Sequence, residues 1–136
     1  MGALTYCTVG SNRLEDAKAF YDALLSLAGL EPIFEHPTGG RVYGTAAGPN
    51  FGVLGPFDGR PATVGNGSMF AFIFDTREDV ERFHAKGLEL GGACEGLPGV
   101  RGGGLYLAYF RDLDGNKLCA YAMPGAPIRR RSPSEH

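Results

Sequence analysis

The apolar and polar positions of this chain follow the same order twice. Residues 4–9 are rich in β-branched and aromatic side chains, which predicts a strand. Apolar residues then recur at helical spacing and predict a helix with one buried face. This predicted face consists of Leu14, Ala17, Tyr21, Leu24 and Ala28. Three short extended stretches follow at 32–35, 41–45 and 51–54, separated by glycine- and proline-containing turns.

The second half repeats this order. Residues 69–74 predict a strand, Val80, Phe83 and Gly87 mark the inner face of a helix, and extended stretches follow at 93–95, 105–111 and 117–123. An offset of 63 residues places Phe20 on Phe83, Gly29 on Gly92 and Tyr6 on Met69. Such a repeat indicates one small unit built twice.

Polar residues and glycines set the expected ends of these elements. Asn12 with Glu15, and Asp75 with Glu78 in the repeat, are spaced as helix N-caps with a reciprocal acidic partner. Gly29 is placed to close the first helix in a left-handed conformation. Asp114-Gly115 is typical of a tight hairpin turn, and residues 55–67, rich in glycine and proline, are expected to link the two halves.

Each half is therefore predicted to be a βαβββ module whose helix covers one face of its sheet and leaves the other face bare. Two such modules complete each other when their bare faces enclose a groove. We expect an α+β fold, one pseudo-symmetric domain over residues 1–123 with mixed sheets curled around a central groove and one helix outside each. The modules would span 1–54 and 68–123, and residues 124–136 would form a flexible tail.

Composition limits the classes of partner. The 136 residues are 43% hydrophobic and carry a formal net charge of -2, which fits one globular domain and gives no reason to expect nucleic acid. No apolar run reaches the length of a membrane helix, so no membrane partner is expected. The basic run Arg129–Arg131 lies in the expected tail. Cys7, Cys94 and Cys119 form no metal-type pair, and with no apparent signal peptide a reduced cytoplasmic location is expected.

Three segments resemble the vicinal oxygen chelate superfamily, also described as glyoxalase / bleomycin-resistance / extradiol dioxygenase. Residues 8–21 look like the strand-to-helix opening of that family, residues 65–72 like the start of its second module, and residues 109–118 like its closing hairpin. The resemblance covers nearly the whole chain up to Met123. The family's closing hairpin usually has proline where Leu113 stands here.

The resemblance implies where a metal would be held. In metal-dependent relatives, ligands come from the first and last strand of each module, typically His or Gln and then Glu. Those positions here are Tyr6, Gly52, Met69 and Cys119. Hard and borderline divalent cations need several oxygen or imidazole ligands, which this set does not offer. We therefore expect no metal and no cofactor, with Met69 and Cys119 lining an apolar cavity.

Strand alternation predicts the residues that face the groove. Beyond the four ligand positions, these are Thr8, Ala71, Ile73 and Tyr121. For the strand at 105–111 two parities are open, Tyr106 with Ala108 or Leu107 with Tyr109, and we favour the first. Tyrosine rings on apolar walls suit a small, flat, partly aromatic molecule. Arg41, Arg101 and Arg111 are candidates to hold a carboxylate or phosphate, with solvated edge charges at least as good an interpretation.

Other chemistry is weakly supported. His36 and His84 are interpreted as structural residues, with a general-base role for His36 as the lesser alternative. Asp112-Leu113-Asp114-Gly115-Asn116 lacks the closing ligands of a calcium loop and is interpreted as a turn. No acidic residue falls on the predicted groove face, which argues against cationic ligands of the bleomycin type.

Three functions remain. The first is a protein that binds a small molecule in a metal-free groove, its ligand unknown. The alternative is a glyoxalase-like lyase or isomerase, of the lactoylglutathione-lyase type, with a degenerate site that would use Tyr6, Cys119 or His36 for proton transfer. The third is a structural or regulatory module. A homodimer is a further expectation from the resemblance, and pairing of modules within one chain or across a dimer stays open.

Overall fold

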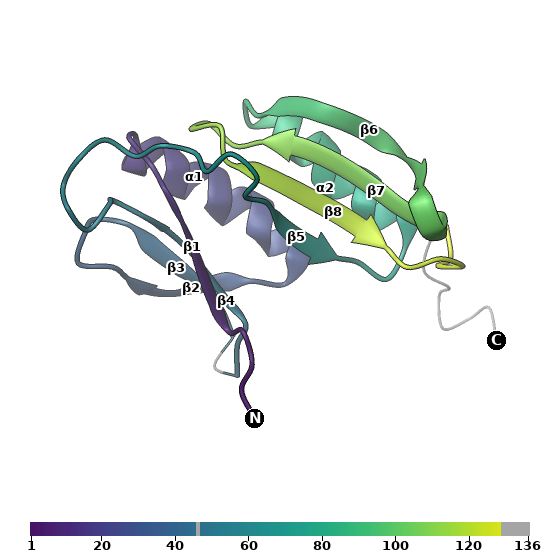
Figure 1. The fold of residues 1–136 in the computed structure, drawn as a ribbon, viewed down its shortest axis with the longest axis horizontal. Coiled ribbons are helices and arrows are strands. Elements are labelled where there is room, and N and C mark those ends of the chain that lie inside the picture. The colour runs from purple at the N-terminus through teal and green to yellow at the C-terminus, as the bar shows by residue number, and fades with distance from the viewer. Residues whose placement is uncertain (46, 129–136) are drawn as a thin grey trace. The chain divides into compact units, whose positions relative to one another are not determined.

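The computed structural model describes residues 1–45 and 47–128, and these fall into two compact units (Figure 1). The first unit comprises Met1–Ser68 together with Asp112–Asn116. The second comprises Met69–Arg111 and the chain from Lys117 onward. Each unit contains one long helix and one four-stranded sheet.

The first unit follows the predicted βαβββ order. Its elements are β1 (Tyr6–Gly10), α1 (Leu14–Leu25), the short 3-10 turn η1 (Ser26–Ala28), β2 (Glu31–Glu35), β3 (Arg41–Gly44) and β4 (Asn50–Leu54). The strands lie in the order β1-β4-β3-β2, with β1 parallel to β4 and the other neighbours antiparallel. Gly29 ends the 3-10 turn with a φ of 74°, as its left-handed role predicted.

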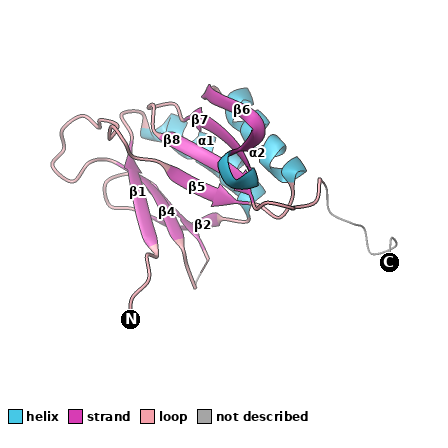
Figure 2. Cartoon of the chain, turned by 45° about the vertical axis from the view of Figure 1, so that its right-hand side comes forward, coloured by secondary structure: helices cyan, strands magenta, loops and turns pink. Residues whose placement is uncertain are grey.

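The second unit repeats this topology. Its elements are β5 (Phe70–Ile73), α2 (Arg77–Glu89), β6 (Ala93–Arg101), the 3-10 segment η2 (Gly102–Gly104), β7 (Leu105–Arg111) and β8 (Lys117–Ala122). The strand order is β5-β8-β7-β6, again with one parallel pair, β5 with β8 (Figure 2). The two helices begin 63 residues apart, at Leu14 and Arg77, so the repeat and the α+β module pair are confirmed. β6 is longer than the predicted stretch 93–95.

The predicted helix caps are wrong by one residue. Arg13, not Asn12, stands at the start of α1, and the Asn12 side chain instead exchanges two hydrogen bonds with the backbone of Ala62. In the second unit Thr76, not Asp75, caps α2, and its hydroxyl accepts a bond of 3.1 Å from the Asp79 backbone N–H. Both differences arise because a competing partner is present: the linker backbone for Asn12, and a hydroxyl one residue later for Asp75.

Each helix packs its apolar face on one side of its own sheet. In the first unit the buried Tyr21 ring lies 5.1 Å from the Phe51 ring of β4, and Leu24 and Leu25 are completely buried beside it. In the second unit the Phe83 ring of α2 meets Phe72, Phe74 and Phe110. Gly87 lets this helix approach the sheet closely, because a Cβ there would stand 2.3 Å from the Phe110 ring.

The turn between β7 and β8 belongs to the first unit and carries its largest buried polar network. The Asp112 carboxylate is 5% exposed and accepts bonds from the Tyr21 hydroxyl (2.5 Å), the Asn116 amide (2.9 Å) and the backbone N–H groups of Asp114 and Asn116. Asn116 also donates to the Gly10 carbonyl. Burial, followed by the nearby Asp112 charge, raises the pKa of Tyr21 well above its usual value, so this phenol stays a donor.

The described part of the expected tail, residues 124–128, forms hydrogen bonds with the start of α2. The carbonyls of Pro127 and Ile128 accept hydrogen bonds from the backbone N–H groups of Arg77 and Glu78, at the N-terminus of α2. These bonds satisfy two donors that a helix start leaves open. The basic run Arg129–Arg131 lies outside the described residues.

Replacement of Gly87 by alanine is expected to destabilise the protein by about 1–3 kcal/mol in urea unfolding, because the added methyl group overpacks the buried Phe110 ring. Helix propensity alone predicts the opposite sign, a gain of about 1 kcal/mol. Gly102→Ala is the control, since nothing lies within 4 Å of its Cβ position. A Gly87→Ala protein as stable as wild type would contradict the close helix–sheet contact.

Tyr21→Phe is expected to cost about 1.5–3 kcal/mol in the same measurement, because it removes a buried hydrogen bond to a carboxylate. Tyr106→Phe is a matched control, since the Tyr106 hydroxyl donates to Glu81 at the exposed surface and its loss should cost less than about 0.5 kcal/mol. Equal effects of the two substitutions would show that the Asp112 network contributes no special stability.

Candidate functional site

On the helix-free face of each sheet, the ligand position expected on the last strand pairs with a residue of the first strand in matching registers. Thr8 of β1 pairs with Gly52 of β4, and Ala71 of β5 pairs with Cys119 of β8. The repeat relates these two pairs, because Thr8 and Ala71 lie 63 residues apart. Their neighbours along the strands, such as Val9 and Phe51, are buried on the helix side. These residues therefore lie on the face away from the helix, as strand alternation predicted, and their contact with a ligand stays a prediction.

Tyr6 lies over Gly52 in the first unit. A Cβ at Gly52 would stand 3.2 Å from the Tyr6 hydroxyl oxygen and 3.4 Å from the Thr8 methyl group. The missing side chain of Gly52 thus provides the room that the Tyr6 phenol uses. In this unit, one predicted ligand position carries a phenol and the other carries no side chain.

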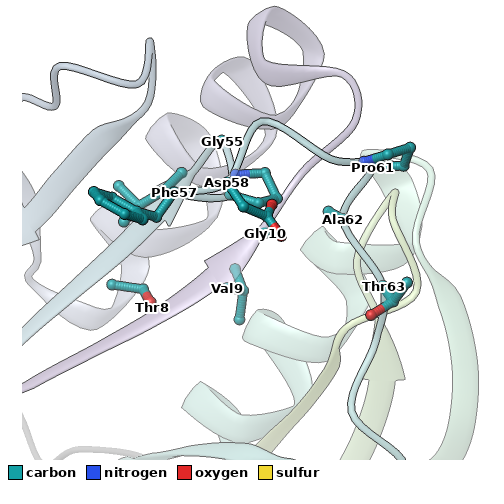
Figure 3. Close-up of a pocket in the computed structure, with 11 residues that line it drawn as sticks. Thr8, Val9, Gly10, Gly55, Phe57, Asp58, Pro61, Ala62 and Thr63 are labelled. Carbon is teal, nitrogen blue, oxygen red and sulfur yellow. The ribbon is translucent and has the colours of Figure 1, made fainter.

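A concavity of about 420 Å³ lies at the end of β1 and β4 and is walled by the linker (Figure 3). Thr8, Val9, Gly10 and Leu54 form the strand side of it, and residues 55–58 and 61–63 form the rest. Gly10 lets the linker lie close, because a Cβ there would be 2.8 Å from the Ala62 Cβ. The two Asn12–Ala62 bonds hold the linker in this place.

The linker contributes residues that the sequence did not indicate. Phe57 is fully exposed and borders both this pocket and a second concavity of about 530 Å³ on the same loop. Asp58 places one carboxylate at the pocket, where the groove strands alone have none. Its Oδ1 accepts the Arg60 backbone N–H, which fixes the turn. The sequence signal that could have indicated this pocket was an aromatic residue, Phe57, between two prolines of the linker.

The favoured parity of strand β7 is wrong. Tyr106 and Ala108 pair with Ala122 and Ala120 on the helix side of the sheet. The Tyr106 hydroxyl donates to Glu81 of α2, and the Arg77 guanidinium lies 4.9 Å from its ring centre. Leu107 and Tyr109 instead pair with Tyr121 and Cys119 on the helix-free face. The correction follows from packing, since the small Ala108 fits beneath the helix while Tyr106 reaches its edge.

All three predicted arginines are bonded within the protein, Arg111 to Glu95 at 2.7 Å. Arg41 faces α1, where it forms ion pairs with Asp22 (2.5 Å) and Glu35 (2.7 Å), so it lies on the opposite side of the sheet from Gly52. Arg101 donates to the backbone carbonyls of Leu97, Gly99 and Leu107. Arg41 is therefore corrected to a helix-side structural residue, because it pairs with the buried Val53 rather than with a groove residue.

Cys119 is a buried thiol on the helix-free face. It is 1% exposed, and burial raises its pKa to about 11, with the nearby Arg101 and Lys117 acting in the opposite direction. Tyr121, two residues further along β8, is half-buried and pairs with Ile73 and Leu107. Met69 directly precedes β5 and is 44% exposed.

The two described histidines outside the tail have structural partners. His36 Nδ1 accepts the Thr38 backbone N–H at 3.2 Å and lies 2.9 Å from the Thr38 hydroxyl, within a turn. His84 is 3% exposed in α2, its pKa is lowered by burial, and its Nε2 lies 3.3 Å from Cys94 Sγ. Both geometries agree with the structural interpretation of these residues.

The donors present do not fit a family-type metal. Tyr6 offers a phenol, Gly52 no side chain, Met69 a thioether, and Cys119 a thiol whose raised pKa keeps it protonated near neutral pH. Divalent ions such as Mg²⁺, Mn²⁺ or Zn²⁺ need carboxylate, imidazole or thiolate ligands in convergent groups. Within residues 1–45 and 47–128, no three His, Cys, Asp or Glu side chains converge in that way.

Two βαβββ modules with paired first and last strands define the fold class of the glyoxalase-like proteins. A family model of the Glyoxalase/Bleomycin resistance protein/Dioxygenase superfamily matches residues 3–120. The chain belongs to this superfamily.

Solved structures support the same assignment. A glyoxalase/bleomycin resistance protein from Albidiferax ferrireducens is 45% identical, with a TM-score of 0.80 over 88% of this chain and 98% of its own. A glyoxalase/bleomycin resistance protein/dioxygenase family enzyme from Burkholderia phytofirmans is 16% identical, with a TM-score of 0.71 over 90% of this chain and 99% of its own. A lactoylglutathione lyase from Agrobacterium tumefaciens is 20% identical, with a TM-score of 0.68 over 90% and 94%. The last two show the fold alone.

Two further findings concern curated relatives and membrane-spanning helices. A search of curated proteins found no match to this sequence. Among the residues that the structure describes, no helix combines the length and the apolar character needed to cross a membrane.

The raised pKa of Cys119 predicts its titration. In a Cys7→Ser, Cys94→Ser protein, the ultraviolet absorbance of the remaining thiolate should appear only as the pH approaches about 11. The sign follows from burial, which disfavours the charged form of an acid. In denaturant the same thiol should titrate near about 8.5. A folded-state titration close to that ordinary value would show that Cys119 is solvated or stabilised as a thiolate.

Proposed function

We propose that this protein binds a small, partly aromatic molecule in its groove and that the binding needs no metal. The observation that carries the proposal is the occupancy of the family's ligand positions. Tyr6 fills the space over Gly52, and Cys119 is a buried, protonated thiol. The chain keeps the strands that would position a metal in metal-dependent relatives. At the ligand positions on those strands, Tyr6 supplies a ring and a hydroxyl, and Met69 and Cys119 supply sulfur.

The pocket between the ends of β1 and β4 and the linker, which Thr8 and Leu54 line, is large enough for a small ligand. A volume of about 420 Å³ falls in the ordinary range for small-molecule sites, roughly 300–1,000 Å³. The Thr8 hydroxyl and the Asp58 carboxylate give it polar groups, and the Leu54 side chain and the exposed Phe57 ring give it apolar and aromatic surface. The exposed ring supports a flat, partly aromatic molecule as the ligand.

A glyoxalase-like lyase or isomerase is the alternative function, suggested by the family and by the name of the Agrobacterium relative. That chemistry requires a base and a group that stabilises developing negative charge. The buried Cys119 thiol is protonated, and His36 Nδ1 is occupied by Thr38. These contacts favour binding over catalysis.

Thermal unfolding with a panel of small aromatic compounds tests the proposal. A compound that binds the native state at about 100 times its Kd adds about 2.7 kcal/mol of stability. We expect at least one compound to raise the Tm, and the rise to be the same with and without EDTA. A rise that disappears with EDTA and returns when a divalent metal is added would contradict metal-free binding.

Two substitutions locate the effect. Thr8→Tyr places a ring in the pocket and should abolish the Tm rise, because it fills the volume the ligand needs. Ala19→Tyr, on the exposed surface of α1, adds the same ring away from the pocket and should leave the rise unchanged. An unchanged rise in the Thr8→Tyr protein would place the ligand elsewhere.

A further inference from the structure

Cations gather on the helix-free face of the second unit. The Arg101 guanidinium carbon lies 5.3 Å from the centre of the Tyr109 ring, and Lys117 Nζ lies 5.0 Å from the same centre. Arg111 extends from the same face of β7, since it pairs with Lys117 across the hairpin. Glu95 contributes one carboxylate, bonded to Arg111 at 2.7 Å. Three positive charges therefore meet one negative charge around Tyr109.

The donors of these cations are used unequally. The Arg101 guanidinium donates hydrogen bonds to the backbone carbonyls of Leu97, Gly99 and Leu107, and Arg111 forms an ion pair with Glu95. Gly96 makes the arginine position possible, because a Cβ there would stand 3.0 Å from the Tyr109 ring and 3.2 Å from Arg101 Nη2. Lys117 differs: within residues 1–45 and 47–128 its ammonium has no carboxylate at ion-pair distance.

The surroundings of Lys117 are aromatic and apolar. Tyr109 and Cys119 pair across β7 and β8, and Leu107 and Tyr121 form the next pair along the same face. Ile73 and Met69 on the β5 side are 57% and 44% exposed, so this face presents apolar surface to whatever lies against it. Cys119 adds no negative charge, because burial keeps its pKa high.

We propose that this face binds the carboxylate of a small aromatic acid, with the Lys117 ammonium as its counter-charge and the Tyr109 and Tyr121 rings beside the aromatic body. This inference concerns the sheet of the second unit and goes beyond the proposed function, whose pocket lies at Thr8 and the linker in the first unit. Net positive charge on an apolar, ring-lined face is complementary to an anion and disfavours a cation. A single ammonium is a point charge, which suits one carboxylate, whereas phosphate recognition more often uses the bidentate fork of an arginine. Here both neighbouring arginines are already bonded.

Arg101 supports the site without contacting the ligand. Its three carbonyl bonds hold the end of β6 against β7 and keep its charge over the Tyr109 ring, where cation–π attraction is favourable within about 6 Å. The charge thus adds to the positive potential that an anion meets. Arg101 was predicted as a ligand contact, and its role here is a positioning one.

Calorimetric titration of the full chain with three probes of similar shape tests the proposal. The probes are benzoate, benzyl alcohol and benzylamine, which are anionic, neutral and cationic. We expect benzoate to bind at least about tenfold tighter than benzyl alcohol, with benzylamine weakest. Lys117→Gln should weaken benzoate about tenfold and leave benzyl alcohol unchanged, while Lys117→Arg should restore most of the preference. Lys86→Gln is the control, because Lys86 pairs with Glu89 on α2.

The outcomes separate this inference from the proposed function. Equal affinities for benzoate and benzyl alcohol would overturn the anion preference while supporting metal-free binding of small aromatics. Equal effects of Lys117→Gln and Lys86→Gln on benzoate would also overturn it. A failure of all three probes to bind would overturn this inference, whereas the proposed function is tested separately by the compound panel with and without EDTA. If Lys117→Gln folds poorly, the salt dependence of benzoate binding to the wild-type protein provides the test instead. The affinity should fall as the salt concentration rises, and an unchanged affinity would overturn the inference.

Discussion

Each sheet of this protein is covered by a single helix, and the rest of the structure depends on that one-sided packing. Because side chains alternate along a strand, residues such as Phe51 and Phe110 enter the core while their neighbours Gly52 and Tyr109 stay on the other face. Most of the buried apolar side chains of the sheets thus lie on the helix side, and Cys119 is a buried residue of the other face. Substitutions on that face can change its chemistry without loss of the fold, which makes it the place where members of one family can diverge.

The helix-free faces of this chain combine a kept geometry with changed residues. The parallel pairs Thr8–Gly52 and Ala71–Cys119 preserve the strand registers of both modules. Gly52 makes room for the Tyr6 phenol, and Gly96 makes room for Arg101 beside Tyr109. These two glycines thus let an aromatic and a cationic group lie on the sheet surfaces. The proposed binding would use ring faces, hydroxyls and the Lys117 ammonium, without a bound divalent ion.

Local patterns predicted the fold well, and non-local contacts explain where the sequence interpretation fell short. The 63-residue repeat predicted the element order, and alternation predicted that Thr8 and Cys119 lie on the face away from the helix. For β7, alternation left open whether Tyr106 or Tyr109 faces the groove. Packing of Tyr106 against α2 shows that Tyr109 lies on the helix-free face. The Asn12 contact with Ala62 and the burial of Asp112 beside Tyr21 join residues 50 or more apart, which no short-range pattern reveals. The pocket residues Phe57 and Asp58 lie in a linker without periodicity, so only the folded chain places them.

The most direct test of the central claim is a titration of the purified, chelator-treated protein with Zn²⁺, Ni²⁺ and Mn²⁺, followed by heteronuclear NMR. If the groove works without a metal, these ions should show no stoichiometric, saturable binding and should cause no selective shift or broadening of the Tyr6, Thr8, Met69, Ala71 and Cys119 signals. Stoichiometric binding of one of these ions, with perturbations centred on those residues, would contradict that claim and would restore a metal to the groove.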